Sequence, residues 1–141
     1  MKQYQATNTI EATPEMIWKV LTEASGYQEW DPYCERIEGT IALGEKIKAY
    51  TTLSPGRAFP VKVSEFIPNR KMVWTGGMPL GLFKGVRTFS LTPQPNGSTT
   101  FRVEETFSGP MLKLIGKSLP DMTEPFQKFV EGLKRRAEEG V

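Results

Sequence analysis

The sequence predicts an α+β fold in which an antiparallel sheet curves around a long helix near the C-terminal end of the chain. The helix is indicated by apolar residues that recur at helical spacing and form one stripe: Met122, Phe126, Phe129, Val130, Leu133 and Ala137. The sheet is indicated by a series of short segments after residue 34, each bounded by Gly or Pro. Because a helix cannot bury such a stripe alone, we expect the sheet to wrap around it.

Before the sheet, the chain predicts one strand and two short helices. The strand covers residues 4–12. Thr13 can cap the first helix, and Pro14 suits the first helical position. Residues 25–28 have the spacing of a capping box for the second helix. We expect Pro32 to end that helix, because proline disfavours helical geometry in the residue before it.

Six further strands are predicted, at residues 35–39, 46–53, 60–67, 71–75, 83–92 and 99–108. Turn residues at 68–70 and 93–97 connect strands that we expect to pair. Apolar and polar residues alternate along several of these segments, which predicts one buried and one solvated face. The expected order is therefore strand, two short helices, six strands and the long helix, with about seven strands in one sheet.

The composition favours one domain without nucleic-acid or membrane chemistry. The chain has 141 residues, enough for a full core, and we expect a single domain of residues 1–141. Lys and Arg number 18 and Asp and Glu number 16, so a net charge of +2 gives no electrostatic footprint for nucleic acid. The chain contains no run of 18 apolar residues, so we expect no stable membrane insertion. The sole cysteine, Cys34, fits a reducing compartment, and we expect a cytoplasmic protein.

Histidine is absent from the chain, which excludes Ser-His-Asp and Cys-His catalysis and every histidine-based metal site. One cysteine cannot form a thiolate cage either. We therefore expect no metal and no cofactor, and any catalysis would have to use carboxylates, Lys, Arg, Tyr or bound water. Cys34 has only Arg36 as a basic neighbour in the sequence, and we interpret it as structural rather than reactive.

Five stretches of the chain, in this order, resemble the START-like or Bet v 1-like (SRPBCC) superfamily, and within it the polyketide cyclase/dehydrase and lipid-transport group. They are IEATPEMIW (10–18), WDP (30–32), PNRKMVW (68–74), GVRTFSL (85–91) and ETFSGP (105–110). The resemblance implies a helix-grip fold over the whole chain and a cavity for a small hydrophobic molecule. It carries no catalytic motif that can be transferred residue by residue.

The inward apolar positions are the first candidates for a binding site. Nine residues are predicted to face the space between the sheet and the long helix: Trp74, Phe89, Leu91, Phe101, Val103, Phe107, Phe126, Phe129 and Leu133. They would either line a cavity or fill a solid core. The resemblance favours the cavity.

Arg87 and Glu105 are the polar candidates. If the turn at 93–97 closes symmetrically, Phe89 faces Val103 and Arg87 faces Glu105, so the two charges form an inward ion pair. Such a pair would either be structural or hold a polar ligand group, because the guanidinium fork fits a carboxylate or an enolate. Glu65 shares the parity of Val61 and Val63 and is a weaker third candidate.

Two apolar segments remain. Met78, Leu80, Leu82 and Phe83 lie in a glycine-hinged loop that would either cover the pocket as a lid or pack on the long helix. Residues 110–120 predict either an added helical turn that packs on the sheet, which we favour, or a flexible entry, and we expect Pro120 to break or kink the helix. A membrane anchor carrying only Lys113 and Lys117 is a minor alternative.

Three functions remain open from the sequence. The favoured one is non-catalytic binding or transport of a small hydrophobic molecule, lipid-like, polyketide-like or aromatic. The second is a cyclase or dehydratase that uses the same cavity, with proton transfer through Glu105 and an enolate held by Arg87. The third is a protein-interaction module. The sequence makes no prediction of an oligomeric state.

Overall fold

The computed structural model describes residues 1–140; Val141, the last residue of the predicted domain, and the side chain of Ser118 lie outside the described part. The strands are β1 (Lys2–Ile10), β2 (Cys34–Glu38), β3 (Lys46–Thr51), β4 (Ala58–Ile67), β5 (Lys71–Gly77), β6 (Lys84–Pro93) and β7 (Thr99–Ser108). The helices are α1 (Pro14–Thr22), α2 (Tyr27–Trp30), α3 (Leu112–Ile115) and α4 (Thr123–Glu138), with 3-10 turns η1 (Ala24–Gly26), η2 (Pro79–Gly81) and η3 (Gly116–Ser118).

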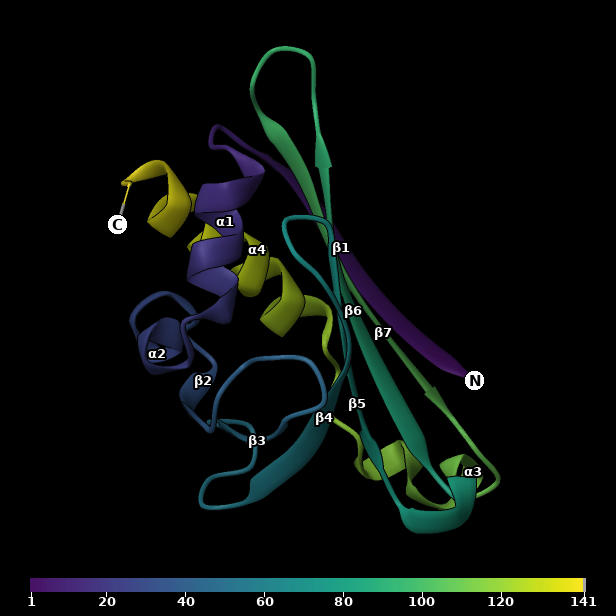
Figure 1. Ribbon diagram of the computed structural model, residues 1–141. Coiled ribbons are helices and arrows are strands. Elements are labelled where there is room, and N and C mark those ends of the chain that lie inside the picture. The colour runs from purple at the N-terminus through teal and green to yellow at the C-terminus, as the bar shows by residue number, and fades with distance from the viewer. Residues whose placement is uncertain (141) are drawn as a thin grey trace.

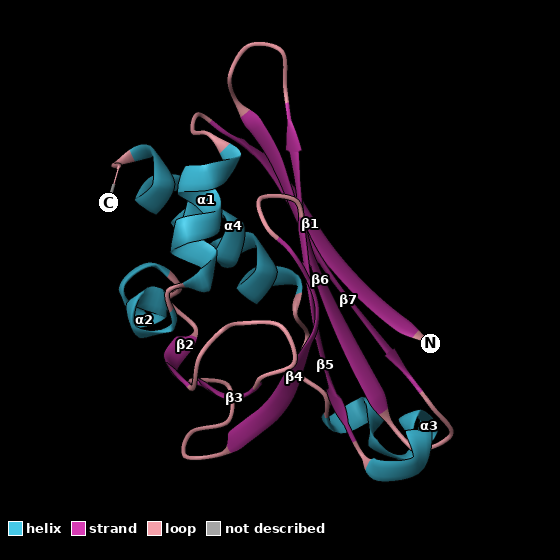
Figure 2. Cartoon of the chain, viewed as in Figure 1, coloured by secondary structure: helices cyan, strands magenta, loops and turns pink. Residues whose placement is uncertain are grey.

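All seven strands form one antiparallel sheet in the order β1-β7-β6-β5-β4-β3-β2. The sheet curves, and α1, α2 and α4 lie on its concave side (Figure 1). Figure 2 shows the same arrangement by type of element, with all the longer helices on one side of the strands. The fold class is confirmed: this is an α+β helix-grip fold.

The capping signals in the sequence predicted the start of α1 correctly and the start of α2 incorrectly. Thr13 caps α1, because its side chain accepts a hydrogen bond from Met16 N at 3.2 Å. The capping box at 25–28 is wrong, since Ser25 lies inside η1 and α2 begins only at Tyr27, without a side-chain cap. Tyr27 is 1% exposed and its hydroxyl donates to Leu21 O at 2.5 Å, so burial of this side chain determines where α2 begins.

The strand register confirms the predicted pairing across the 93–97 turn, with Phe89 opposite Val103 and Arg87 opposite Glu105. One prediction about the neighbouring strand is wrong. A register shift between Val63 and Glu65 breaks the alternation along β4, so Glu65 pairs with Val73 on the outer face. There its side chain is exposed and lies 3.4 Å from Lys71 Nζ.

The stripe of α4 packs on the inner face of the sheet, as the sequence predicts. The ring of Phe129 lies with its centroid 5.9 Å from that of Phe89 and 6.1 Å from that of Phe101. Asn8 ties β1 to the middle of α4 by donating to Val130 O at 2.8 Å. The predicted break at Pro120 is confirmed: α3 and η3 precede it, and α4 begins only at Thr123.

Candidate functional site

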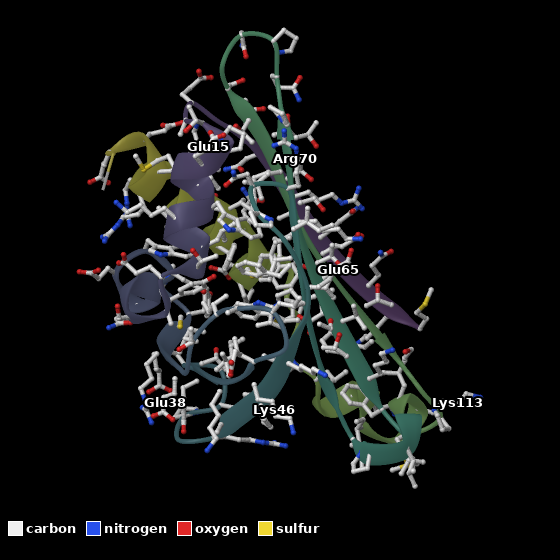
Figure 3. The ribbon with its side chains drawn as sticks, in the orientation of Figure 1. Glu15, Glu38, Lys46, Glu65, Arg70 and Lys113 are labelled. Atoms are coloured by element: carbon white, nitrogen blue, oxygen red, sulfur yellow. The ribbon has the colours of Figure 1, made fainter. Side chains whose placement is uncertain are left out.

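The inner face of the sheet has two parts, which meet at the row that contains Arg87 and Glu105. On the first part, which we call the filled part, seven of the predicted lining residues are at most 3% exposed: Phe89, Leu91, Phe101, Val103, Phe126, Phe129 and Leu133. They belong to one hydrophobic core cluster, and Figure 3 shows side chains occupying the space between α4 and the strands. The solid-core alternative therefore describes this part of the face.

The second part, which we call the open part, extends beyond the N-terminal end of α4, where the strands continue towards the end of the sheet at which α3 lies (Figure 1). Its inward residues are only half buried: Tyr4, Val61, Phe83 and Phe107. Phe83 stacks on Phe107 with ring centroids 5.8 Å apart, and Tyr4 meets Phe107 edge-on at 6.3 Å. This part presents aromatic surface that the protein itself does not fully cover.

Arg87 and Glu105 form the expected ion pair at the boundary between the two parts. Arg87 Nε and Nη2 both donate to Glu105 Oε1, at 3.0 and 2.8 Å. The side chains are 25% and 13% exposed, and the guanidinium lies 5.0 Å from the ring centre of Phe126 on α4. The pair is therefore inward and partly desolvated, with Arg87 over an aromatic face.

Gly85 makes room for this pair and for the aromatic residue beyond it. It is buried, and a Cβ at this position would lie 3.2 Å from Glu105 Oε2 and 3.3 Å from Phe107 Cε1. A larger residue would therefore displace one of the two side chains. The close approach explains why β6 has a glycine here despite the low strand propensity of that residue.

Asp31 joins this cluster from outside the sheet, at the end of α2. Its pKa is raised from 3.8 to about 6, chiefly by burial, while the N–H of Tyr33 and the charge of Arg87 lower it. Tyr33 N donates to Asp31 Oδ1 at 3.1 Å. A carboxyl that titrates close to neutrality beside a guanidinium has the properties of a proton donor and acceptor.

Burial and the charge of Asp31 also raise the pKa values of two further groups, Tyr27 and Cys34. Burial, followed by the charge of Asp31, raises the pKa of Tyr27 well above its usual value. The same two causes, in the same order, raise the pKa of the Cys34 thiol to about 12, and Arg87 lowers it. Cys34 is therefore a thiol at neutral pH, which agrees with its interpretation as unreactive.

Trp74 adds an unused donor beside the ion pair. It pairs with Arg87 across β5 and β6 and is 4% exposed. Its ring packs edge-on against Phe89 with centroids 4.9 Å apart. Its buried Nε1–H has no hydrogen-bond partner among the described residues. A buried donor without a partner costs free energy, so a ligand or a water that accepts this bond would stabilise the site.

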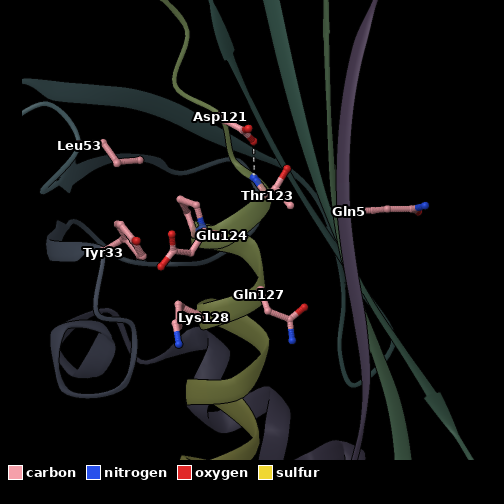
Figure 4. Close-up of a pocket in the computed structure, with 9 residues that line it drawn as sticks. Gln5, Tyr33, Leu53, Asp121, Thr123, Glu124, Gln127 and Lys128 are labelled. Carbon is pink, nitrogen blue, oxygen red and sulfur yellow. Dashed lines mark hydrogen bonds between the residues drawn. The ribbon is translucent and has the colours of Figure 1, made fainter.

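A groove of about 670 Å³ opens at the N-terminal end of α4 and is accessible to solvent. Figure 4 shows Glu124 and Lys128 of α4 on the side of Tyr33 and Leu53, and Asp121 at the start of the helix. Its lining residues are Gln5, Tyr33, Leu53, Asp121, Thr123, Glu124, Pro125, Gln127 and Lys128. None of them is a predicted site residue. However, Pro125 directly precedes Phe126, which faces Arg87.

The four residues predicted as a lid differ in how far they face solvent. Phe83 faces inward and packs on Phe107. Met78, Leu80 and Leu82 are 41%, 96% and 39% exposed, so Leu80 in particular faces solvent in this structure. The lid itself stays a prediction.

Sequence reasoning missed Asp31 and the residues that line the groove. Asp31 was visible only as part of the WDP stretch, where it precedes a helix-ending proline. The charge of Arg87 acts on Asp31 although the two positions are more than fifty residues apart in the chain, and no local pattern reports such proximity. Tyr33 and Leu53 likewise meet α4 only because the β2 end of the sheet curves back towards it (Figure 4).

Within residues 1–140, no group of three His, Cys, Asp or Glu side chains is placed to hold a metal ion. No helix in the same described range is long and apolar enough to cross a bilayer.

A family model described as polyketide cyclase/dehydrase and lipid transport matches residues 1–138. The chain belongs to this family. Membership agrees with the sequence resemblance, and it is compatible both with binding of a hydrophobic molecule and with cyclase or dehydrase chemistry. A search of curated proteins finds no match.

Solved structures of the helix-grip type resemble the chain over nearly its whole length. A START superfamily protein from Mycobacterium smegmatis aligns with a TM-score of 0.70 at 18% identity and covers 99% of both chains. A hypothetical protein from Helicobacter pylori gives 0.78 at 16% identity, over 96% of this chain and 88% of its own. The Aha1 dimer from Colwellia psychrerythraea gives 0.73 at 23% identity, over 99% and 98%. At these identities the likeness shows the fold of this polyketide cyclase/dehydrase and lipid-transport family member.

Proposed function

We propose that this protein binds a small hydrophobic molecule, lipid-like, polyketide-like or aromatic, on the open part of the concave face of the sheet, at the N-terminal end of α4. One observation carries the proposal: the partly buried Arg87–Glu105 pair lies where the filled part of the inner face meets the open aromatic part. An apolar surface with a few convergent polar groups is what sites for small organic molecules commonly present. A ligand with an apolar body and one polar group fits this arrangement.

In the proposed complex, the apolar body of the ligand packs on Phe83, Phe107 and Tyr4. Among the described residues, Arg87 bonds to Glu105 through Nε and one hydrogen of Nη2, so its other N–H groups could meet a ligand carboxylate or carbonyl. Trp74 Nε1 supplies a further donor. The residues of the filled part form the floor of the site and contact the ligand only if α4 moves outward.

The groove at the start of α4 is the proposed entrance. It is open to solvent, and Pro125 is one of its lining residues. The next residue along α4 is Phe126, whose ring packs under Arg87. Tyr33, which lines the groove, is two residues from Asp31 in the chain. The charge of the Arg87 guanidinium lowers the pKa of Asp31. A cytoplasmic location and a single binding domain over the whole chain are part of the same proposal, and the sole cysteine supports the location.

A fluorescence titration with anilinonaphthalene sulfonate, an aromatic anion, tests the proposal. We expect Arg87→Met to weaken its binding about 10- to 100-fold, because a hydrogen bond to a charged group contributes about 1.5–3 kcal/mol. Arg102→Met is the matched control, since Arg102 forms the corresponding ion pair with Glu104 on the outer face and should bind the probe as the parent does.

The double variant Arg87→Met/Glu105→Leu guards against loss of folding, because it removes both charges and leaves neither unpaired. If it folds with a normal melting temperature and binds the probe as tightly as the Arg102→Met control, Arg87 has no part in the site.

Asp31 favours a second candidate function, a cyclase or dehydratase reaction in the same place. The sequence offered no second acid–base group aimed at the Arg87–Glu105 pair, whereas Asp31 has a pKa of about 6 that the charge of Arg87 lowers against the effect of burial. In such a reaction Asp31 would exchange a proton with the substrate while Arg87 stabilises the negative charge that develops on an enolate oxygen.

A further inference from the structure

One end of the sheet carries an exposed apolar surface that neither the fold nor the proposed ligand site uses. We call it the tip and define it as Met78, η2, Leu82 and α3. Leu80 is 96% exposed, Leu114 is 75% exposed, and Met78 and Leu82 are 41% and 39% exposed. They are half of the eight large apolar residues that are exposed in the described chain, and the other four are scattered: Met1, Leu43, Leu53 and Ile67. The gathering on one tip therefore needs an explanation.

The two segments of the tip form one surface, although about thirty residues separate them in the chain. Met111 N donates to Leu82 O at 2.9 Å. A Cβ on Gly109 would lie 2.6 Å from Leu82 O and 2.9 Å from Gly81 O, so the backbones are in direct contact. Figures 1 and 2 show η2 and α3 beside each other at the end of the strands opposite α1.

The backbone at Leu80 indicates that its exposure has a function. Its φ is +61°, a conformation that costs a leucine free energy and that Gly or Asn adopts readily. The one other non-glycine residue with positive φ in the described chain is Asn69, which has the residue type expected there. At position 80 the sequence departs from local preference to place a leucine in solvent, and such departures are typical of functional positions.

The charged residues within the two chain segments that form the tip are all lysines, and Asp121 is the first acidic residue that follows the second segment. Lys84, Lys113 and Lys117 are exposed, and Lys2 reaches the same segment by donating to Gly116 O at 3.4 Å. Residues 76–84 and 108–120 contain no Asp or Glu. Lys113 lies at this end of the molecule in Figure 3. Exposed leucines surrounded by lysines, without acidic residues between them, complement a surface that is negatively charged above an apolar layer.

We propose that the tip docks reversibly on the surface of a membrane that contains anionic lipids. Leu80 and Leu114 enter the boundary between headgroups and acyl chains, and the lysines meet the lipid phosphates. The short helix and the 3-10 turn are too small to span a bilayer, so the contact is peripheral. Leu82 is followed by Phe83, which belongs to the open part of the inner face, so docking would bring that part close to a source of apolar molecules. The docking itself does not depend on the proposed ligand site.

Flotation of the full chain with lipid vesicles tests the proposal. We expect binding to vesicles of phosphatidylcholine with phosphatidylglycerol, little binding to phosphatidylcholine alone, and weaker binding as salt is added. Lys113→Gln/Lys117→Gln should lower the affinity about 30-fold, because each lysine near an anionic surface contributes about fivefold. Leu80→Asn/Leu114→Ser should lower it at least about tenfold, and Asn suits the backbone at position 80.

Two control variants carry the same changes elsewhere. Leu43→Ser removes a leucine that is 64% exposed, and Lys46→Gln/Lys62→Gln removes two exposed lysines that face each other across β3 and β4. Both should float with the vesicles as the parent does. Equal losses in the control and tip variants would overturn the proposal, as would absence of binding or equal binding to both kinds of vesicle.

Self-association through the tip is the competing explanation, and light scattering distinguishes it. If the parent is a dimer that Leu80→Asn/Leu114→Ser converts to a monomer without any change in vesicle binding, the tip is an interface between copies of this chain and the proposal is wrong. Binding of anilinonaphthalene sulfonate by the tip variants should remain as in the parent, so failure of the docking proposal is separate from failure of the ligand site.

Discussion

At the scale of single residues, the Arg87–Glu105 pair illustrates what alternation can predict. The pairing followed from parity along two strands and a symmetric turn, and the register and the bond lengths confirm it. The same reasoning was wrong for Glu65, because one irregular residue in β4 reverses the face of every residue beyond it. Parity is reliable only along an uninterrupted ladder.

Asp31 gives a prediction about stability and pH. Its pKa is about 6 in the folded protein and 3.8 in the reference state, so between these values the folded state binds more protons and stability falls as the pH rises. Asp31→Asn keeps an oxygen for the bond from Tyr33 N. We expect it to match the parent near pH 4 and to exceed it by up to about 3 kcal/mol above about pH 7.

Urea unfolding at both pH values measures this difference, and a gap that does not change with pH would contradict the assignment. The same variant tests the enzymatic candidate. Turnover of a polyketide-like substrate that depends on Asp31 should be lost in Asp31→Asn, while binding of anilinonaphthalene sulfonate persists. If turnover persists as well, Asp31 is not the acid–base group.

At the scale of elements, α4 is determined by its stripe and positioned by one close approach. Gly132 lies where α4 meets α2, and a Cβ there would stand 1.9 Å from Trp30 O. Without a side chain at this position, the helix can lie directly against the backbone of α2. No sequence pattern indicates this contact, since glycine inside a helix ordinarily indicates only a weaker helix.

Gly132→Ala tests the close approach. Alanine in the interior of an exposed helix usually stabilises relative to glycine by about 1 kcal/mol. Here we expect the opposite sign, a loss of about 1–3 kcal/mol in the free energy of unfolding, because α2 must move away from α4. Gly116→Ala is the control, since the nearest atom to its Cβ would be 3.8 Å away and its φ of −57° suits alanine. Equal effects at the two sites would show that the contact is unimportant.

At the scale of the whole molecule, the division of the inner face into a filled and an open part gives a contrast between two phenylalanines. Phe126 is 2% exposed within the filled part, and Phe107 is half buried in the open part. We expect Phe126→Ala to lower the free energy of unfolding by about 3–5 kcal/mol. Phe107→Ala should cost clearly less stability, because fewer atoms pack around that ring, and should weaken binding of anilinonaphthalene sulfonate more.

Thermal melting and the dye titration, performed on both variants, check this contrast. The reverse order, with Phe107 critical for stability and neutral for the dye, would mean that the open part is core and not a binding surface. A comparable stability loss at both positions would remove the distinction between the two parts.

The amino-acid pattern by itself determined the α+β class, the order of the elements, the stripe of α4 and the break at Pro120. These features depend on apolar periods of two and 3.6 residues and on the geometry of proline, and all of these are local properties of the chain. Only the tertiary structure decided that Asp31 lies within electrostatic reach of Arg87, that α4 covers part of the inner face, and that Leu80 and Leu114 share one tip. These features depend on how far the sheet curves and where its helices come to rest. Both result from packing among residues that are distant in the chain, which no short pattern records.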